Sequence, residues 1–182
     1  MLILIFIFEN KRLNLRGVNS IKKLELSKKT IMKKICIALD SSPSAKKIAK
    51  IGLNYANALQ AEVVFIHVVY DAGVYVNRYD PIMNYNGFLV NQNIKIVESL
   101  EKEATSFLES TAKYLEKPTT EVQVINGNPE YEILNFATEW NADLLVIGTH
   151  SHSFLEDIFM GNIATSIVKN SKIPVLVIPV KE

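Results

Sequence analysis

The sequence contains few of the residues that disulfide-bonded and fibrous proteins require, namely cysteine, glycine and proline. Its 182 residues include one cysteine, Cys36, with only seven glycines and six prolines. A single cysteine excludes an intrachain disulfide and fits a reducing compartment. The low glycine content excludes a collagen-like fibre, and a hydrophobic share of 48% excludes a disordered chain. We therefore expect a globular protein of one domain, with a core large enough to be stable without disulfides.

Charge is distributed unevenly along the chain, although the formal net charge is only +1. Residues 1–31 carry seven lysines and arginines against two glutamates, whereas residues 32–182 carry 13 basic and 17 acidic side chains. The larger part is mildly acidic, and nucleic acids bind to basic surfaces. We therefore expect no nucleic-acid partner.

The first eight residues are apolar, and a polar, basic stretch follows them. Eight residues are too few to cross a bilayer, which takes about 20 in a helix. A secretory signal carries its positive charge before the apolar run, whereas here the charge follows. We predict a cytoplasmic protein without a membrane span. We interpret 1–31 as an extension outside the fold, with Met32 as the natural start, and a weak amphipathic membrane contact is the alternative.

Short runs of β-forming apolar residues alternate with amphipathic segments from residue 33 onward. Buried strands are predicted at 35–39, 62–69, 143–148 and 174–178, and an alternating run at 121–125 predicts a strand nearer the sheet edge. Helices are predicted at 45–59, 91–116, from Pro129 onward and at 161–169. Strands separated by helices run parallel through right-handed crossovers. The predicted fold class is α/β, a doubly wound parallel sheet with helices on both faces.

Ligands of such sheets bind beyond the carboxyl ends of the strands. Gly148 stands at one of these ends, where a glycine lets the backbone approach a ligand closely. Gly161 and Asn162 begin a helix, whose free N–H groups favour an anion. These two features could hold a phosphate chain between them. The alternatives are a tight turn at Gly148 and a simple N-cap at Asn162, and Asp40 could likewise be the N-cap of the first helix.

The segment 70–90 is irregular and rich in tyrosine, with Gly73, Pro81 and Gly87 as turn signals. A connection of this length inside a compact domain is a functional lid, a surface for a protein partner or a mobile loop. The sequence leaves these three interpretations open.

Five stretches with a fixed order and spacing point to a known family. They are KKICIALDSS at 33–42, VVFIHV at 63–68, DLLVIGTH at 143–150, MGNIA at 160–164 and IPVLVIP at 173–179. With them, residues 32–182 resemble the universal stress protein family. The resemblance implies five strands in the order 3-2-1-4-5, with strands counted along the domain. It also implies a homodimer through the last strand, residues 174–179. Many members bind ATP through a pattern of Gly, two residues, Gly, nine residues, Gly, then Ser or Thr.

This chain matches the ATP pattern in part. Gly148 and Gly161 hold the first and third glycine positions, whereas Ser151 replaces the second glycine and Asn162 replaces the Ser or Thr. Ser151 places a side chain where phosphate oxygens would lie, although its hydroxyl can donate a hydrogen bond. Asn162 keeps an amide that can donate. We expect weakened or altered nucleotide binding.

The resemblance also assigns positions around an adenine nucleotide. It implies that Ala38 and Asp40 border the ribose and adenine, and that backbone groups of Val68 bind the base. The residues that it places at the phosphates are His150, Ser151, Gly161, Asn162 and Ile163, with Gly148 as the first glycine of the pattern. The cofactor implied is ATP, with or without Mg²⁺.

Other chemistry has weaker support. No nucleophile elbow, P-loop or dinucleotide motif occurs, and His150 with His152 lacks further metal ligands at suitable spacing, so we interpret both as solvent-facing loop histidines. His67 is interpreted as a satisfied core histidine and Cys36 as inert packing. We expect a binding protein that acts as a sensor or regulator in stress, without enzyme activity apart from slow incidental ATP hydrolysis.

Two alternatives remain open. The first is a nucleotide-free dimeric interaction module that binds an unidentified protein through 70–90, which the departures at Ser151 and Asn162 favour. The second is a nucleotidyl-transfer or pyrophosphatase enzyme of the same fold, against which counts the lack of glycines at 40–44. The homodimer also has a physical reason, because the apolar last strand is expected at a sheet edge, which tends to be paired or covered.

Overall fold

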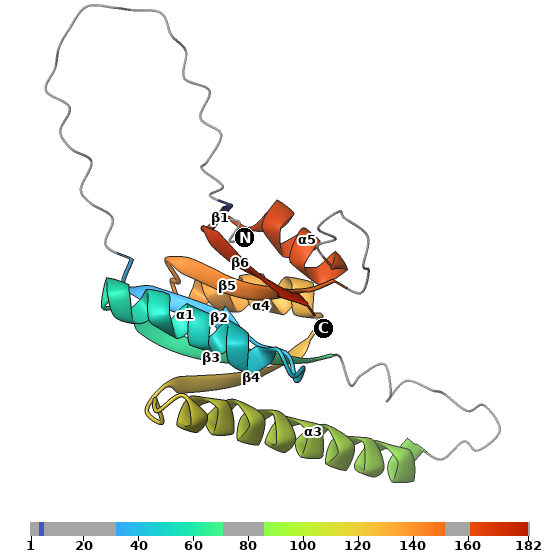
Figure 1. Ribbon diagram of the computed structural model, residues 1–182. Coiled ribbons are helices and arrows are strands. Elements are labelled where there is room, and N and C mark those ends of the chain that lie inside the picture. The colour runs from blue at the N-terminus through green and yellow to red at the C-terminus, as the bar shows by residue number, and fades with distance from the viewer. Residues whose placement is uncertain (1–3, 6–31, 71–85, 152–160, 182) are drawn as a thin grey trace, which may run out of the picture.

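The computed structural model describes residues 4–5, 32–70, 86–151 and 161–181, and it forms one twisted sheet between two layers of helices (Figure 1). The strands are β1 (Leu4–Ile5), β2 (Lys34–Ala38), β3 (Glu62–Tyr70), β4 (Glu121–Gly127), β5 (Leu144–Ser151) and β6 (Val175–Lys181). The helices are α1 (Ala45–Leu59), α3 (Asn86–Tyr114), α4 (Pro129–Glu139) and α5 (Asn162–Asn170).

The sheet has the order β1-β6-β5-β2-β3-β4 in the described residues. The strands from β2 to β6 pair in parallel, and β1 alone pairs antiparallel, at the outer edge of β6. Counted along the domain, the five parallel strands have the predicted order 3-2-1-4-5. The predicted doubly wound α/β fold is therefore confirmed.

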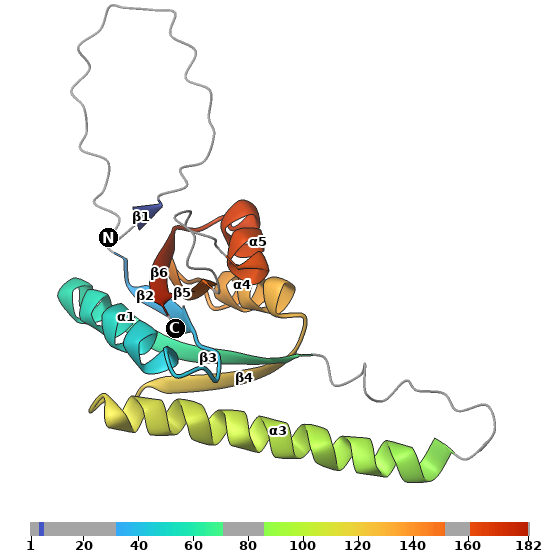
Figure 2. The same cartoon turned by 45° about the vertical axis from the view of Figure 1, so that its right-hand side comes forward.

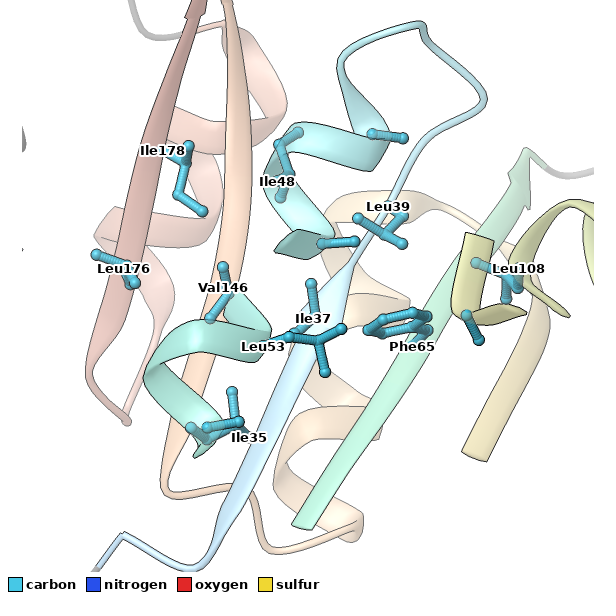
Figure 3. Close-up of a cluster of buried hydrophobic side chains, with 14 of the residues drawn as sticks. Ile35, Ile37, Leu39, Ile48, Leu53, Phe65, Leu108, Val146, Leu176 and Ile178 are labelled. Atoms are coloured by element: carbon cyan, nitrogen blue, oxygen red, sulfur yellow. The ribbon is translucent and has the colours of Figure 1, made fainter. Parts of the chain in front are cut away.

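Each face of the sheet buries its own apolar cluster. Alternate residues of β2 point to opposite faces: Ile35 and Ile37 pack under α1 and α3, whereas Cys36 packs toward α4 and α5. Figure 3 shows the first cluster, in which Phe65 of β3 lies between Ile37 and Leu108 of α3. The two helix layers lie on opposite sides of the sheet in Figure 2. Because central strands are covered on both faces, their sequence runs are apolar throughout, as the sequence analysis assumed.

The structure corrects two predicted boundaries. Helix α3 begins at Asn86, not at residue 91, so the last part of the supposedly irregular segment 70–90 is helical. Strand β5 runs to Ser151 rather than ending at Gly148, because Thr149, His150 and Ser151 continue the ladder with β6. The glycine was taken as the end of the strand, but pairing with β6 outweighs the low strand propensity of Gly148.

The amino ends of the strands are tied together by polar contacts. The carboxylate of Asp143, just before β5, accepts hydrogen bonds from the backbone N–H groups of Lys33 and Lys34 at 2.7 and 3.0 Å. The ammonium group of Lys34 lies 4.5 Å from the ring centre of Trp140 and 3.9 Å from the carboxylate of Glu62. Two backbone donors at this end of the sheet are therefore satisfied within the protein.

Among the helices that the structure describes, none combines the length and apolar character needed to cross a lipid bilayer. The prediction that 1–31 lies outside the fold stays a prediction for most of that segment. Its described part, Leu4–Ile5, is paired with β6.

Candidate functional site

A cavity of about 490 Å³ opens at the carboxyl ends of β2, β3 and β5, where the N-terminus of α5 also lies. Its volume is within the range of small-molecule sites, roughly 300–1,000 Å³. It is lined by Ala38, Leu39, Asp40, Ile48, Ile66, His67, Val68, Pro129, Ile133, Ile147, Gly148, Gly161, Asn162, Ile163, Ala164 and Ile167. The cavity lies where strand order reverses, the position expected for a ligand in a doubly wound sheet.

Seven of the nine predicted site residues line this cavity. They are Ala38, Asp40, Val68, Gly148, Gly161, Asn162 and Ile163. The backbone of His150 and Ser151 lies in β5, which corrects the interpretation of His150 as a loop residue. Their side chains, together with residues 71–85 and 152–160, fall outside the described residues, so the predicted phosphate contacts of those two side chains stay predictions.

Backbone groups of β3 open into the cavity because β2 is shorter than its neighbour. The N–H of Glu62 donates to the carbonyl oxygen of Lys33, and the C=O of Ile66 accepts from the N–H of Leu39 at 2.9 Å. The backbone groups of the even-numbered residues of β3 therefore point toward β2. Strand β2 ends at Ala38, whereas β3 continues to Tyr70. The N–H and C=O of Val68 therefore point past the end of β2, toward the cavity.

His67 fixes the chain at the end of β2. Its Nδ1 atom lies 2.8 Å from the carbonyl oxygen of Leu39, which can only accept, so Nδ1 carries the proton and donates. Its ring packs edge-on against Phe107 of α3, with ring centres 6.2 Å apart. His67 is a satisfied histidine, as predicted, but it also lines the cavity. The hydrogen bond holds the backbone immediately before Asp40.

Asp40 shapes a turn. One interpretation of the sequence made it the N-cap of the first helix, and the structure corrects this. The N-cap of α1 is Ser44. The Oδ1 atom of Asp40 accepts from the backbone N–H and the hydroxyl of Ser42, at 3.2 and 2.6 Å. The hydroxyls of Ser42 and Ser44 lie 2.8 Å apart. This network holds the Asp40 carboxylate at the rim of the cavity.

Gly148 is required by the packing of a helix on the sheet. A Cβ atom at this position would lie 2.2 Å from Cδ1 of Ile48 and 3.1 Å from its Cγ1. Ile48 belongs to α1 and is 2% exposed, so it has little room to move. The tight turn offered as an alternative is absent, since Gly148 continues in β5. A close approach of α1 to β5 therefore explains this glycine without any ligand.

The start of α5 presents backbone donors to the cavity. Gly161 is the N-cap and makes no side-chain cap, so Asn162 is the first helical residue and not the N-cap that the sequence suggested. The first N–H groups of a helix have no partner within the helix, and its dipole favours negative charge there. Ile163, on the same turn, is 45% exposed. An anionic group of a ligand would find its donors here.

Sequence reasoning missed the apolar part of the lining. Ile66, Ile133 and Ile147 face the cavity, and Ile133 comes from α4, which no motif connected with the site. His67 could have been found, because it directly precedes Val68 at the end of a strand. The contribution of α4 depends on helix packing over the sheet, which no local pattern reports.

Cys36 and the acidic residues offer no further reactive centre in the described part. Cys36 is fully buried, and burial raises the pKa of its thiol far above the ordinary value, which fits the predicted inert role. No group of three or more His, Cys, Asp or Glu side chains suitable for a metal ion is found within 32–70, 86–151 and 161–181.

Comparison with known proteins identifies relatives along the same part of the chain. A family model described as the universal stress protein family matches residues 32–179. Universal stress protein MJ0531 of Methanocaldococcus jannaschii is 32% identical over 157 residues, which cover 84% of this chain and 86% of that protein. Two solved structures share the fold.

The first is universal stress protein UspA from Lactobacillus plantarum, with a TM-score of 0.64, 19% identity, and coverage of 81% of this chain and 97% of that one. The second is the universal stress protein from Archaeoglobus fulgidus in complex with dAMP, with a TM-score of 0.51, 22% identity, and coverage of 81% and 98%. The segment that the family model matches, residues 32–179, contains β2 to β5, most of β6 and every lining residue of the cavity.

Proposed function

Since the chain belongs to the universal stress protein family, we propose that it binds an adenine nucleotide, in the first place ATP, in the cavity at the carboxyl end of the sheet. In this proposal the protein is a cytoplasmic sensor or regulator that responds to the nucleotide by binding, without catalysis. The observation that carries the proposal is the cavity itself, which combines apolar walls, open backbone groups and a helix N-terminus.

The walls suit a purine base. Ala38, Ile66 and Ile133 supply apolar contact for the flat faces of adenine, since each lines the cavity and is at most 9% exposed. The N–H and C=O of Val68 offer one donor and one acceptor in the plane of the sheet. Adenine presents a ring nitrogen that accepts and an amino group that donates, so a single backbone residue can bind its edge.

The remaining groups suit a ribose and a phosphate chain. Asp40 lines the cavity at its rim, where its carboxylate could accept hydrogen bonds from ribose hydroxyls. The backbone N–H groups at Asn162 and Ile163 would bind phosphate oxygens. Asp40 is the one carboxylate among the described lining residues, so Mg²⁺ would be held mainly by the phosphates of ATP.

A relative supports the ligand class. The Archaeoglobus fulgidus protein was solved in complex with dAMP, an adenine nucleotide, on the same fold. For this chain, the apolar walls and the α5 N-terminus support the same class of ligand.

The test is calorimetric titration of ATP and AMP into the full chain, with and without Mg²⁺, for the wild type, Ile163→Glu and Ile163→Gln. A carboxylate in the first turn of α5 is compatible with the helix dipole, so Ile163→Glu should fold normally. It would repel phosphates, and we expect ATP affinity to fall about tenfold or more while AMP affinity falls less. Ile163→Gln is the matched neutral control and should stay close to the wild type.

The outcomes separate the alternatives. Micromolar ATP binding that is weakened by Ile163→Glu supports the proposal and the phosphate position. No heat and no thermal shift at millimolar ATP would contradict it, and the nucleotide-free interaction module would then lead. Release of pyrophosphate or ADP at a steady rate would instead favour an enzyme of this fold.

A further inference from the structure

We propose that β1 covers the free edge of β6 and thereby excludes pairing of β6 with a second copy of this chain. Leu4 and Ile5 pair antiparallel with Leu176 and Val175, at the outer edge of the sheet (Figures 1 and 2). The inference concerns a part of the molecule separate from the cavity, because no residue of β1 or β6 is among the described lining residues. It therefore stands or falls independently of nucleotide binding.

The hydrogen bonds of β5 and β6 decide which groups of β6 are open. The N–H of Leu145 donates to the carbonyl oxygen of Pro174 at 3.0 Å, so Pro174 and the even-numbered residues after it point toward β5. The backbone N–H and C=O groups of Val175 and Val177, and the C=O of Pro179, consequently point away from β5, toward the outer edge of the sheet. The sheet thus has a second row of backbone groups on this side.

Proline shortens this open row. Pro179 has no N–H, so among Val175, Val177 and Pro179 only the two valines can donate. Ile5 stands opposite Val175, whose groups point outward, and Leu4 stands opposite Leu176. In an antiparallel ladder such an outward pair exchanges both backbone hydrogen bonds. Strand β1 therefore uses one of the two outward donors of β6 before Pro179.

A second copy would need the same groups. Two identical strands related by a two-fold axis pair antiparallel, in the same direction relative to β6 as β1. A two-fold ladder centred on Val177 would place residue 178 of the second copy opposite Leu176 and residue 179 opposite Val175, where β1 now lies. The two arrangements exclude each other. The predicted homodimer through 174–179 is thus conditional on release of β1.

The sequence around β1 fits its place. Leu4 and Ile5 belong to an apolar run, residues 1–8, that consists mostly of β-branched and aromatic side chains, the types that favour strands. Val175 and Leu176 are 2% and 1% exposed, so the edge that β1 covers is part of the core and not a polar surface. Uncovered, it would be a template for pairing with another chain.

The experiment compares the full chain with an Ile5→Pro variant by sedimentation velocity and by amide hydrogen exchange. We expect the wild type to be a monomer with a protected Val175 amide. In Ile5→Pro the ring and the missing N–H break the pair with Val175, so exchange at Val175 should accelerate about tenfold or more in dilute protein. At higher concentration the variant should dimerise at least tenfold more tightly than the wild type.

Two further variants make the result specific. Adding Val177→Pro to Ile5→Pro should restore the monomer, because the side chain of Val177 is buried in the core while its N–H points outward, and proline removes this donor from the ladder with the second copy. Leu13→Pro, in the same extension but outside β1, is the matched control and should behave as the wild type. A dimeric wild type, unchanged exchange at Val175, or a variant that stays monomeric would each overturn the proposal. An unchanged thermal transition in Ile5→Pro would show that the domain is intact.

Discussion

The two ends of the parallel sheet are built from similar strands but are completed differently. At the amino end, one carboxylate, Asp143, accepts from two backbone N–H groups, and the ammonium group of Lys34 lies near Glu62 and the ring of Trp140. At the carboxyl end, β2 stops short of β3, and α5 directs its first N–H groups into a cavity. The amino end satisfies these two donors within the protein, whereas the proposed nucleotide would use backbone groups at the carboxyl end. On this proposal, stability and binding are separated along the strand direction.

The separation is not complete, because Gly148 at the carboxyl end is also needed for the packing of α1 on β5. The largest expected effect comes from Gly148→Ala, whose Cβ would lie 2.2 Å from Cδ1 of Ile48. Overpacking of a core contact costs about 1–3 kcal/mol in the free energy of unfolding. Urea denaturation of the wild type and the variant measures it.

A double-mutant cycle with Ile48→Val tests the cause. Valine lacks Cδ1, so the methyl group introduced by Gly148→Ala could occupy its space, and the double variant should be about 1 kcal/mol more stable than the sum of the single effects. Additive effects would show that Gly148 is needed for something other than the contact with α1. The role of Gly148 as a residue of the nucleotide site would then gain weight.

An intermediate effect is expected at the amino end. Asp143→Ala removes the acceptor of two backbone N–H groups, and we expect a loss of about 1–2 kcal/mol, toward the low side because the site is partly exposed. Affinity for ATP should not change. Asp143→Asn is the matched control, since its amide oxygen can still accept one bond. A loss of ATP binding with the fold intact would contradict the separation of the two ends.

The smallest effect on stability is expected at His67, but with a clear effect on binding. His67→Phe keeps a ring against Phe107 and removes the hydrogen bond to Leu39, at a cost of about 1 kcal/mol. Since that bond positions the backbone before Asp40, ATP affinity should fall about threefold to tenfold, as measured by calorimetry.

Phe107→Leu is the complementary control for His67. It removes the ring contact and keeps the hydrogen bond, so it should lower stability without a comparable loss of affinity. If both variants weaken ATP binding equally, His67 acts through packing and the positioning role is wrong.

Much of the fold could be predicted from residue patterns, and the reasons are local. The runs around Ile37, Phe65 and Val146 are apolar throughout because these strands are buried on both faces. Boundaries were less predictable: β5 continues through Gly148 to Ser151 because β6 pairs with it that far. The start of α3 at Asn86 was hidden within a stretch rich in turn residues.

The sequence predicted the residues of the candidate site at strand ends and at the start of α5, but it missed most of the apolar side chains that line the cavity. Strand ends and a helix start are visible in a sequence, and they pointed to Val68 and Gly161, which line the cavity. Ile133 belongs to a helix on one face of the sheet, and only the packing of α4 brings it to the cavity. Distances between helices are set by complementary side chains across the core, which a linear pattern does not encode.

Residue order alone was enough to predict the alternation of strands and helices, the parallel sheet and the end of the sheet at which the cavity lies, because each depends on short-range periodicity and chain connectivity. The folded chain was needed to show that Gly148 accommodates Ile48, that Asp40 closes a turn with Ser42 and is not a helix cap, and that Leu4–Ile5 lie against β6. These contacts join residues brought together by packing or by the path of a turn, and their free energy depends on geometry that exists only once the chain has folded.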